Sequence, residues 1–507
     1  MKNSGTQTQY TAVEQNNQLV LILNSEIKLP EDAPVRVTSA QLEELDYRKL
    51  YAAYSSRGRK SVTDPRVIFK VMAYGYQCGI FSSRKLEEAC QYRVDFMWLL
   101  ENQKAPDHAT FSRFRTGRCS EAVEDLFNQY VSCLETQGEV DHKSVFIDGT
   151  KLESRAGRYT FAWRGTVEKN LGKVKQAVLE ETGYTKPEQL EEYLLKAKEN
   201  IAFVYGKGKR KTDKQRQWEK LDALRQRWTQ YERQLDIMGE GRNSYAKTDT
   251  DATFMRMKEA YNVQIAVNSE YVTGIEAFSN RTDVGTFIPF MRKLELAHQQ
   301  RYEEVTTDAG YESLDNYLYL EANGQMSFIK PTNYEAQKTK KFRDQIGRIE
   351  NMKYNRDEDC FICAEGRKLH CHKESTQMQD GIPVTRAWYR CESCKNCPQR
   401  EQCCRKQDIN APKEVIWKKT FWEKREVSLQ NITSDRGIML RMNRSIQVEG
   451  AFGLLKNDFS FRRFMTTGKR NIRIELFFLA LGFNLKKRWM KQQKSRLETH
   501  YSEKKAS

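Results

Sequence analysis

The chain has 507 residues, enough for two or three domains that each bury a core. Hydrophobic residues make up 39% of it, which excludes a largely disordered protein. The net charge of +17 favours a polyanionic partner, and residues 461–507 alone hold 13 Lys and Arg against three acidic residues. Nucleic-acid binding and a solvated basic tail both agree with this excess.

Export and membrane insertion are not expected. The residues after Met1 are polar, so no signal-peptide core is expected, and the most apolar run, residues 476–483, is too short to cross a bilayer. We therefore expect a cytoplasmic chain, in which clustered cysteines bind metal more often than they form disulfides.

The region from about residue 41 to residue 137 has apolar residues at helical spacing. Asp64-Pro65 is expected to open one helix, and Ser82 and Asp107 to cap the starts of two later helices. The pattern predicts an all-helical N-terminal domain over residues 1–139.

One short predicted helix of this domain, residues 107–116, carries side chains suited to phosphates. They are Thr110, Ser112, Arg113 and Arg115. A helix-turn-helix that binds DNA and a helix that only packs within the domain are both compatible with this pattern.

The periodicity changes after residue 140. Residues 143–148 resemble a buried strand, and strand signals return on both sides of residues 268–270, where they alternate as in a hairpin. The intervening residues 166–240 are charged and helical, which predicts an inserted pair of amphipathic helices. A helix, a strand ending at Asp308, another helix and a strand at 326–330 follow. This order predicts a mixed α/β domain.

The rest of the chain divides by composition. Residues 336–432 hold eight of the twelve cysteines, and a long helical stretch runs from Ser434 to about Lys494. We predict an α/β domain over residues 140–335 with the helical insertion 166–240, a cysteine-rich insertion 336–432, C-terminal helices 433–490 and a basic tail 491–507.

Two aspartates are predicted at strand ends that small turn residues follow. These motifs are Asp148-Gly149-Thr150 and Asp308-Ala309-Gly310. A sheet holds such carboxylates in place, and two-metal cleavage of phosphodiesters needs carboxylate oxygens to bridge the ions. Because Asp-Gly after a strand is usually only a turn, a site also needs a third carboxylate beside the same sheet.

Glu449 is the candidate third carboxylate. In its helical segment Glu449, Gly453 and Lys456 share one face beside an apolar stripe, so Glu449 can bind metal while Lys456 contacts a phosphate. The alternative is an exposed pair on an amphipathic helix. Three other acidic residues are interpreted as structural or supporting: Glu153, Asp249 and Asp251.

Eight cysteines fall within 45 residues. They are Cys360, Cys363, Cys371, Cys391, Cys394, Cys397, Cys403 and Cys404. Two Cys-x2-Cys turns can close one tetrahedral zinc site, so a zinc-ribbon-like insertion is predicted, with His370 and His372 as substitute ligands. Unliganded thiols, a second ion and an iron–sulfur cluster are the alternatives, although Glu401 stands where the last cysteine of an iron–sulfur run would fall.

Several segments form a specific pattern when taken in order. They are residues 64–66, 107–115, 146–154, 162–165, 248–252, 307–311 and 444–456. In this order the chain resembles bacterial insertion-sequence DDE transposases, above all the IS eleven-eighty-two group, with an InsH-type N-terminal domain. The resemblance extends almost to Arg488.

The resemblance implies an RNase H-like catalytic domain, a mixed sheet flanked by helices, with Asp148, Asp308 and Glu449 binding Mg²⁺ or Mn²⁺. Lys456 keeps the family's Glu-x6-Lys spacing. The family's tyrosine and arginine are replaced by Met442 and Ser445, and Arg444 stands one residue before the arginine position.

The resemblance also implies a zinc set. Cys394, Cys397 and Cys403 are similar to cysteines of the family, and Cys360 and Cys363 complete the set.

The implied function is DNA transposition by a homo-oligomer that is associated with the nucleoid when bound to DNA. Such an enzyme binds terminal inverted repeats, cuts DNA with an activated water and joins the 3′-hydroxyl to target DNA. The residues expected on DNA are Arg113, Arg115, Arg444, Lys456, Arg462 and Arg463. If a hairpin forms, Trp163 or Phe461 is the candidate to stack on a flipped base. A structure-selective nuclease and a catalytically silent DNA-binding regulator are the rival functions.

Overall fold

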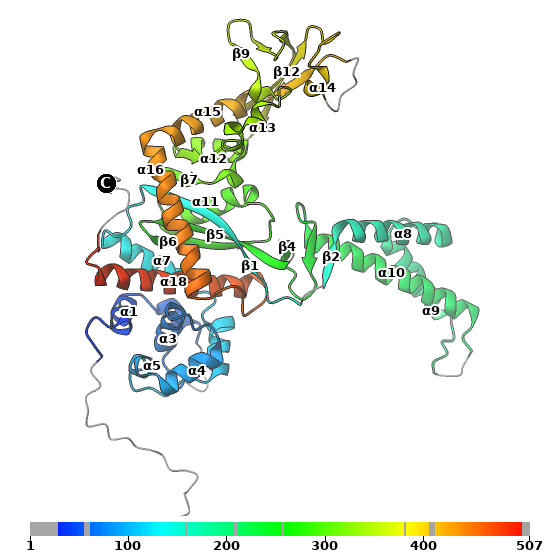
Figure 1. Ribbon diagram of the computed structural model, residues 1–507. Coiled ribbons are helices and arrows are strands. Elements are labelled where there is room, and N and C mark those ends of the chain that lie inside the picture. Colours follow the sequence, from blue (N-terminus) through cyan, green and yellow to red (C-terminus); the bar gives the residue numbers. More distant parts are fainter. Residues whose placement is uncertain are drawn as a thin grey trace, which may run out of the picture.

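The computed structural model describes residues 29–54, 61–157, 160–206, 210–255, 258–379, 382–404 and 411–498. The first 28 residues of the predicted N-terminal domain and the end of the predicted basic tail lie outside these ranges. Three parts extend in different directions from a central sheet: a group of N-terminal helices, a helical arm and a β-rich lobe (Figure 1). Within the described ranges no helix has the length and apolarity needed to cross a membrane.

The central sheet is mixed, as predicted. On one side of β1 lies β5, which is antiparallel to it and also pairs with β4 and β6; on the other side lie β7 and then β8, both parallel to β1. This arrangement fits the expected RNase H-like fold. The strands are β1 (Ser144–Glu153), β4 (Thr253–Met255), β5 (Lys258–Asn268), β6 (Tyr271–Phe278), β7 (Glu304–Thr307) and β8 (Met326–Ile329).

The predicted hairpin is β5–β6. Its two-residue loop, Ser269-Glu270, has φ angles of 49° and 75°, the left-handed conformation whose twist matches that of paired strands. The helices α11 (Phe287–His298) and α12 (Leu314–Ala322) follow at their predicted places between the parallel strands.

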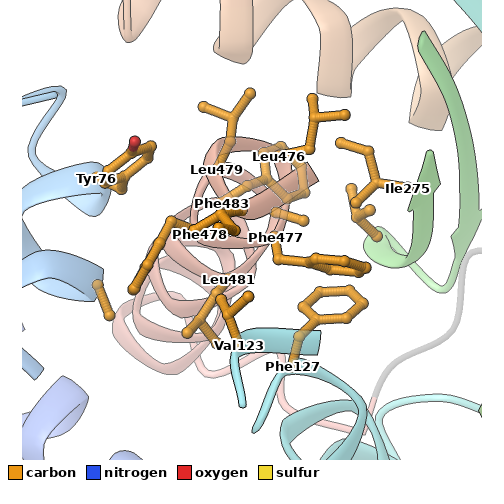
Figure 2. Packing of buried hydrophobic residues seen from close by; sticks show 14 of the residues in the cluster. Tyr76, Val123, Phe127, Ile275, Leu476, Phe477, Phe478, Leu479, Leu481 and Phe483 are labelled. Carbon is orange, nitrogen blue, oxygen red and sulfur yellow. The ribbon is translucent and has the colours of Figure 1, made fainter. Parts of the chain in front are cut away.

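The helix α18 (Lys469–Gln493) lies between the sheet and the N-terminal helices and packs against α3, α7 and β6 (Figure 1). Its apolar run is buried as predicted, and Figure 2 shows its side chains reaching both neighbours, Tyr76 and Phe127 on the helical side and Ile275 on β6. One continuous core therefore joins the two parts. The N-terminal helices are α1 (Pro34–Glu43), α2 (Arg48–Ala52), α3 (Pro65–Gln77), α4 (Ser83–Tyr92), α5 (Val94–Leu99), α6 (His108–Arg113) and α7 (Val123–Thr136).

α18 approaches the backbone of α3 closely at Gly482. A Cβ atom there would lie 2.7 Å from the backbone nitrogen of Gln77 and 2.8 Å from the backbone carbon of Tyr76. We therefore expect Gly482→Ala to lower the free energy of unfolding by about 1–3 kcal/mol, measured by denaturant titration. Gly172 in α8 (Arg164–Thr182) has nothing within 4 Å of its Cβ position, so Gly172→Ala is the matched control. It should raise stability by about 0.5–1 kcal/mol through helix propensity, and equal effects of the two changes would contradict the close contact.

The long helical stretch predicted from Ser434 to about Lys494 is interrupted in its middle. Helical structure stops at Asp458 and resumes at Lys469. The intervening chain runs beside the end of β1, where Glu153 donates its N–H to the carbonyl of Arg462 and accepts from the N–H of Phe464. This pairing with a distant strand leaves no periodic signal in the local sequence.

The helical insertion forms an arm with its own small core, which includes Leu171, Leu194 and Trp228. It contains three helices rather than the predicted pair, because Pro187 starts a separate helix. They are α8, α9 (Pro187–Glu199) and α10 (Asp213–Met238), and the short strands β2 (Phe161–Trp163) and β3 (Ser244–Ala246) pair at the base of the arm.

The cysteine-rich insertion is a lobe built on an antiparallel sheet in the order β13-β12-β11-β10-β9. Its core contains Phe361, Leu369 and Tyr389. The elements are β9 (Lys353–Asn355), β10 (Cys360–Ile362), β11 (Lys368–Gln379), β12 (Ile382–Cys391), α14 (Arg400–Cys403) and β13 (Glu414–Trp417). The helix α15 (Lys419–Thr433) leads back and packs against β8.

Candidate active site

Asp148 lies in the middle of β1, so the prediction that it ends a strand is wrong. On one side β5 pairs with β1 from Phe146 to Glu153, whereas on the other side β7 pairs only with Ser144 to Phe146. β1 continues past Asp148 because its backbone pairing with β5 extends to Glu153. On the side of β7 the sheet opens two residues before Asp148, whose side chain is 18% exposed.

Asp308 follows β7 directly, and its side chain accepts a hydrogen bond from the N–H of Gly310 (2.9 Å). The guanidinium of Arg444 joins the two aspartates: its Nη2 lies 2.9 Å from Asp148 Oδ2 and 3.8 Å from Asp308 Oδ2. The structure thus brings together Asp148, Asp308 and Arg444, although they are far apart in the sequence.

Negative charge is concentrated in this poorly solvated place. Burial raises the pKa of Asp148 to about 6; Arg444 opposes this rise, while Asp308 and Asp283 add to it. Carboxylates that repel one another in a half-buried site are suited to a divalent cation. The donor set therefore fits the predicted magnesium or manganese.

Asp283 is a fourth carboxylate of the site, which the sequence reasoning missed. Its Oδ1 accepts hydrogen bonds from Lys151 Nζ (2.9 Å), Asn262 Nδ2 (2.7 Å) and Gln264 Nε2 (3.1 Å). It packs so closely on Gly149 that a Cβ there would lie 2.7 Å from Asp283 Oδ1. One sequence signal could have pointed to this part of the site: polar residues stand at alternate positions of the buried strand β5. They are Asn262 and Gln264, and both are fully buried.

Glu449 lies on the helical segment that begins with α16 (Asp435–Arg444). Arg444 at the end of α16 contacts Asp148, and Lys456 further on donates a hydrogen bond to Thr150 Oγ1, so the segment runs along β1. Glu449 is exposed, and its carboxylate accepts a hydrogen bond from Ser445 Oγ (3.1 Å). The segment continues through the π-helical turn η6 (Ser445–Glu449), α17 (Gly450–Gly453) and a second π-helical turn, η7 (Leu454–Asp458).

The three predicted metal ligands are not gathered equally. Asp148 and Asp308 share Arg444, whereas the carboxylate of Glu449 accepts a hydrogen bond from Ser445 on its own helical segment. In the structure, which describes all three residues, the carboxylate oxygens of Asp148, Asp308 and Glu449 do not all lie within 4.8 Å of one another. π-Helical turns are frequent at functional sites, and one of them ends at Glu449.

The three rival carboxylates have structural contacts. Asp249 is buried, accepts from Tyr261 Oη (2.7 Å) and the N–H of Gly468 (3.2 Å), and Asp251 accepts from the N–H of Lys469 (2.8 Å). These two residues hold the start of α18. Glu153 pairs with Lys258 (2.8 Å).

The phosphate-binding surface predicted on residues 107–116 is only partly exposed. Arg113 is exposed and, with Lys104 and Arg118, lines an open cavity of about 730 Å³. Arg115 is 3% exposed and donates to the carbonyl of Phe81 (2.6 Å), so its prediction as a DNA contact is wrong. A π-helical turn, η1 (Phe114–Arg118), follows α6 and rotates Arg115 inwards.

The segment after η7 holds the other predicted DNA contacts. Arg462 is exposed, whereas Arg463 donates to the carbonyls of Ser154 and Ala156 (both 3.0 Å) and fastens its segment to the end of β1. Phe461 is 2% exposed in the core, which excludes it as a stacking platform in this conformation. Trp163 is 39% exposed at the base of the arm.

The predicted zinc ligands are only partly gathered: Cys363 and Cys394 lie near Cys391, and Cys403 lies near Cys394. Among the described cysteines no three sulfur atoms lie within 4.8 Å of one another. Cys360 is buried in β10, whereas Cys394 lies near Cys391 and Cys403, and burial raises the pKa of Cys391 to about 12. The sequence reasoning left Cys391 out of the ligand set, and the zinc set of Cys360, Cys363, Cys394, Cys397 and Cys403 stays a prediction.

A mixed sheet with aspartates on neighbouring parallel strands, one within β1 and one directly after β7, is the arrangement expected of an RNase H-like enzyme. Two protein-family models match the chain: a "Transposase DDE domain" over residues 362–489 and a "Transposase domain (DUF772)" over residues 23–117. Both matches support the resemblance to bacterial insertion-sequence DDE transposases, and they are consistent with the IS eleven-eighty-two group. The first match includes Glu449 and Lys456 but neither Asp148 nor Asp308. No curated protein matches the chain.

Proposed function

We propose that the chain binds the terminal inverted repeats of an insertion sequence, cuts the DNA there and joins the freed 3′-hydroxyl to target DNA. The observation that carries the proposal is the pair Asp148 and Asp308, brought together around Arg444 in a chain that matches transposase families at both ends. Asp148, Asp308 and Glu449 would hold Mg²⁺ or Mn²⁺, which activates the attacking oxygen and neutralises the leaving one.

The protein side chains around these ligands have separate tasks. Lys151, Asn262 and Gln264 fix Asp283 beside Asp148 and so maintain the negative charge that attracts cations. Arg444 supplies a guanidinium where a scissile phosphate would lie, and guanidinium groups suit phosphate oxygens.

DNA outside the site would be held by sequence-independent contacts to phosphates. The exposed Arg113, with Lys104 and Arg118 in the same cavity, supports a role for the N-terminal helices, and the exposed Arg462 lies near the end of β1. Lys456 is bonded to Thr150, so a phosphate contact requires that side chain to exchange partners. We further propose a homo-oligomer on DNA, because two element ends must be cut together.

Two other functions are tested by the same experiment. A structure-selective nuclease would cut without joining, and a DNA-binding regulator would bind without cutting.

The test is a strand-transfer assay with DNA that carries the element's ends, a target plasmid and Mg²⁺. We expect the wild-type chain to produce both cleaved and joined DNA, and Asp308→Ala to lose both while still binding DNA. Asp213→Ala, at a side chain 98% exposed on the arm, is the matched control and should behave as wild type. Cleavage without joining would replace the proposal by the nuclease, and binding without cleavage would replace it by the regulator.

A further inference from the structure

A second cluster of ligand-type side chains lies where the N-terminal helices meet the sheet. Glu135 is in the last turn of α7, His142 lies just before β1, and His298 ends α11. One ligand atom from each lies within 4.8 Å of the other two, the only such group of three in the described ranges. His142 Nε2 is 2.5 Å and His298 Nδ1 is 3.5 Å from Glu135 Oε1.

The tautomer of His298 follows from the hydrogen bond that its ring nitrogen Nε2 makes. Its Nε2 lies 2.9 Å from the carbonyl oxygen of Thr273, which can only accept, so Nε2 carries the hydrogen. In the neutral ring Nδ1 then presents a lone pair towards Glu135. Metal-binding histidines are typically oriented in this way, with the second nitrogen donating to a backbone carbonyl.

Three polar atoms of this cluster have no hydrogen bond of regular geometry. Glu135 Oε1 and both ring nitrogens of His142 are buried and make no hydrogen bond of regular geometry to the described residues, although Glu135 Oε1 contacts both histidines as an ion pair. His142 is 6% exposed and the side chain of His298 is 2% exposed. Buried polar groups are nearly always paired, so the short approach of His142 to Glu135 without hydrogen-bond geometry needs another explanation.

We infer that Glu135, His142 and His298 bind a divalent transition-metal ion, for which the two imidazoles and one carboxylate favour Zn²⁺. The three ligands come from separate segments, so the ion would fasten α7 to the start of β1 and the end of α11. The site is distinct from that of Asp148 and Asp308 and does not depend on the proposed catalysis.

The backbone around His142 supports a built site. His142 has φ 52°, and Asp141 before it accepts from the N–H of Lys143 (3.0 Å) and from Asn268 Nδ2 (2.8 Å). These bonds hold the turn that aims His142 at Glu135. The ring of Tyr302 covers His142 at 5.0 Å between centroids and shields the cluster from solvent.

The test compares metal binding by the full chain and by Glu135→Gln and His298→Gln, since glutamine at 298 can still donate to the Thr273 carbonyl. After removal of metal with a chelator, we expect the wild type to bind one more Zn²⁺ per chain than either variant. Zn²⁺ should raise the unfolding temperature through that site in the wild type alone. His108→Gln, at a half-exposed histidine on α6, is the matched control and should bind as wild type.

Thiols in the cysteine-rich lobe are removed from the count by changing all eight of its cysteines to serine in every chain compared. In that background one equivalent of Co²⁺ should give visible ligand-field bands without a thiolate charge-transfer band. Equal metal binding by the wild type and Glu135→Gln would overturn the inference. The absence of Co²⁺ ligand-field bands from the chain with Glu135, His142 and His298 intact would also overturn it, and the cluster would then be a His–Glu–His ion pair without metal. This spectrum needs no ligand variant, so it does not depend on whether such a variant folds.

Discussion

Glu449→Gln is expected to lower DNA cleavage and strand transfer on the order of 10³-fold while DNA binding is retained. Glutamine keeps the size of the side chain and can accept from Ser445 as glutamate does, but it removes the negative charge that a bound metal requires. The rate should be measured in single turnover with Mg²⁺, and binding by a mobility shift in Ca²⁺.

The matched control is Glu426→Gln, an exposed glutamate on α15, the helix before α16. Its cleavage rate should stay within about threefold of wild type, since it lies outside the proposed site. If Glu449→Gln also stayed within that range, Glu449 would not be the third ligand, and Asp283→Asn would become the informative variant. Comparing the two variants distinguishes the loss of a metal ligand from the general effect of removing one negative charge.

The elements of the sheet were predictable because their signals are local. The alternating hairpin, the strand before Asp308 and the helices around it follow from residue spacing, turn residues and caps, and the structure has them at the expected places. Asp64 and Asp107 cap their helices by accepting from the N–H groups of Arg66 and Thr110. Ser82 directly precedes α4, as predicted, but its side chain accepts no capping hydrogen bond from the helix.

The errors come from partners that are distant in the sequence. Whether β1 ends at Asp148 depends on β5, and the break before α18 depends on pairing with Glu153. Asp283 is five residues past the end of β6, so looking for acidic residues at strand ends does not find it. It comes to lie beside Gly149 only when the chain folds.

The role of Arg444 was predicted only through resemblance, because it stands one residue before the arginine position of the family motif. The structure gives it a physical basis, the two contacts to Asp148 and Asp308. The π-helical turn that follows α16 changes the angular spacing of later residues, so a one-residue displacement in sequence need not displace a side chain in space.

Phe478→Ala is expected to lower the free energy of unfolding by about 3–5 kcal/mol. Phe478 is fully buried in α18, with its ring centroid 5.3 Å from that of Phe69 and 5.5 Å from that of Tyr76, both in α3. Figure 2 shows it between α18 and the N-terminal helices. Removing it leaves a cavity that neighbouring backbone cannot fill, since Gly482 already holds the two helices in contact. Unfolding is measured by denaturant titration.

The control is Tyr92→Ala, an aromatic 76% exposed on α4 in the same helical part, which should change stability by less than about 0.5 kcal/mol. Because the core that contains Phe478 is continuous from α3 through α18 to β6, both the helical part and the sheet should unfold at a lower denaturant concentration. A variant in which only the N-terminal helices unfolded early would show that α18 belongs energetically to the sheet. In that case the N-terminal helices and the sheet with α18 would be separable folding units.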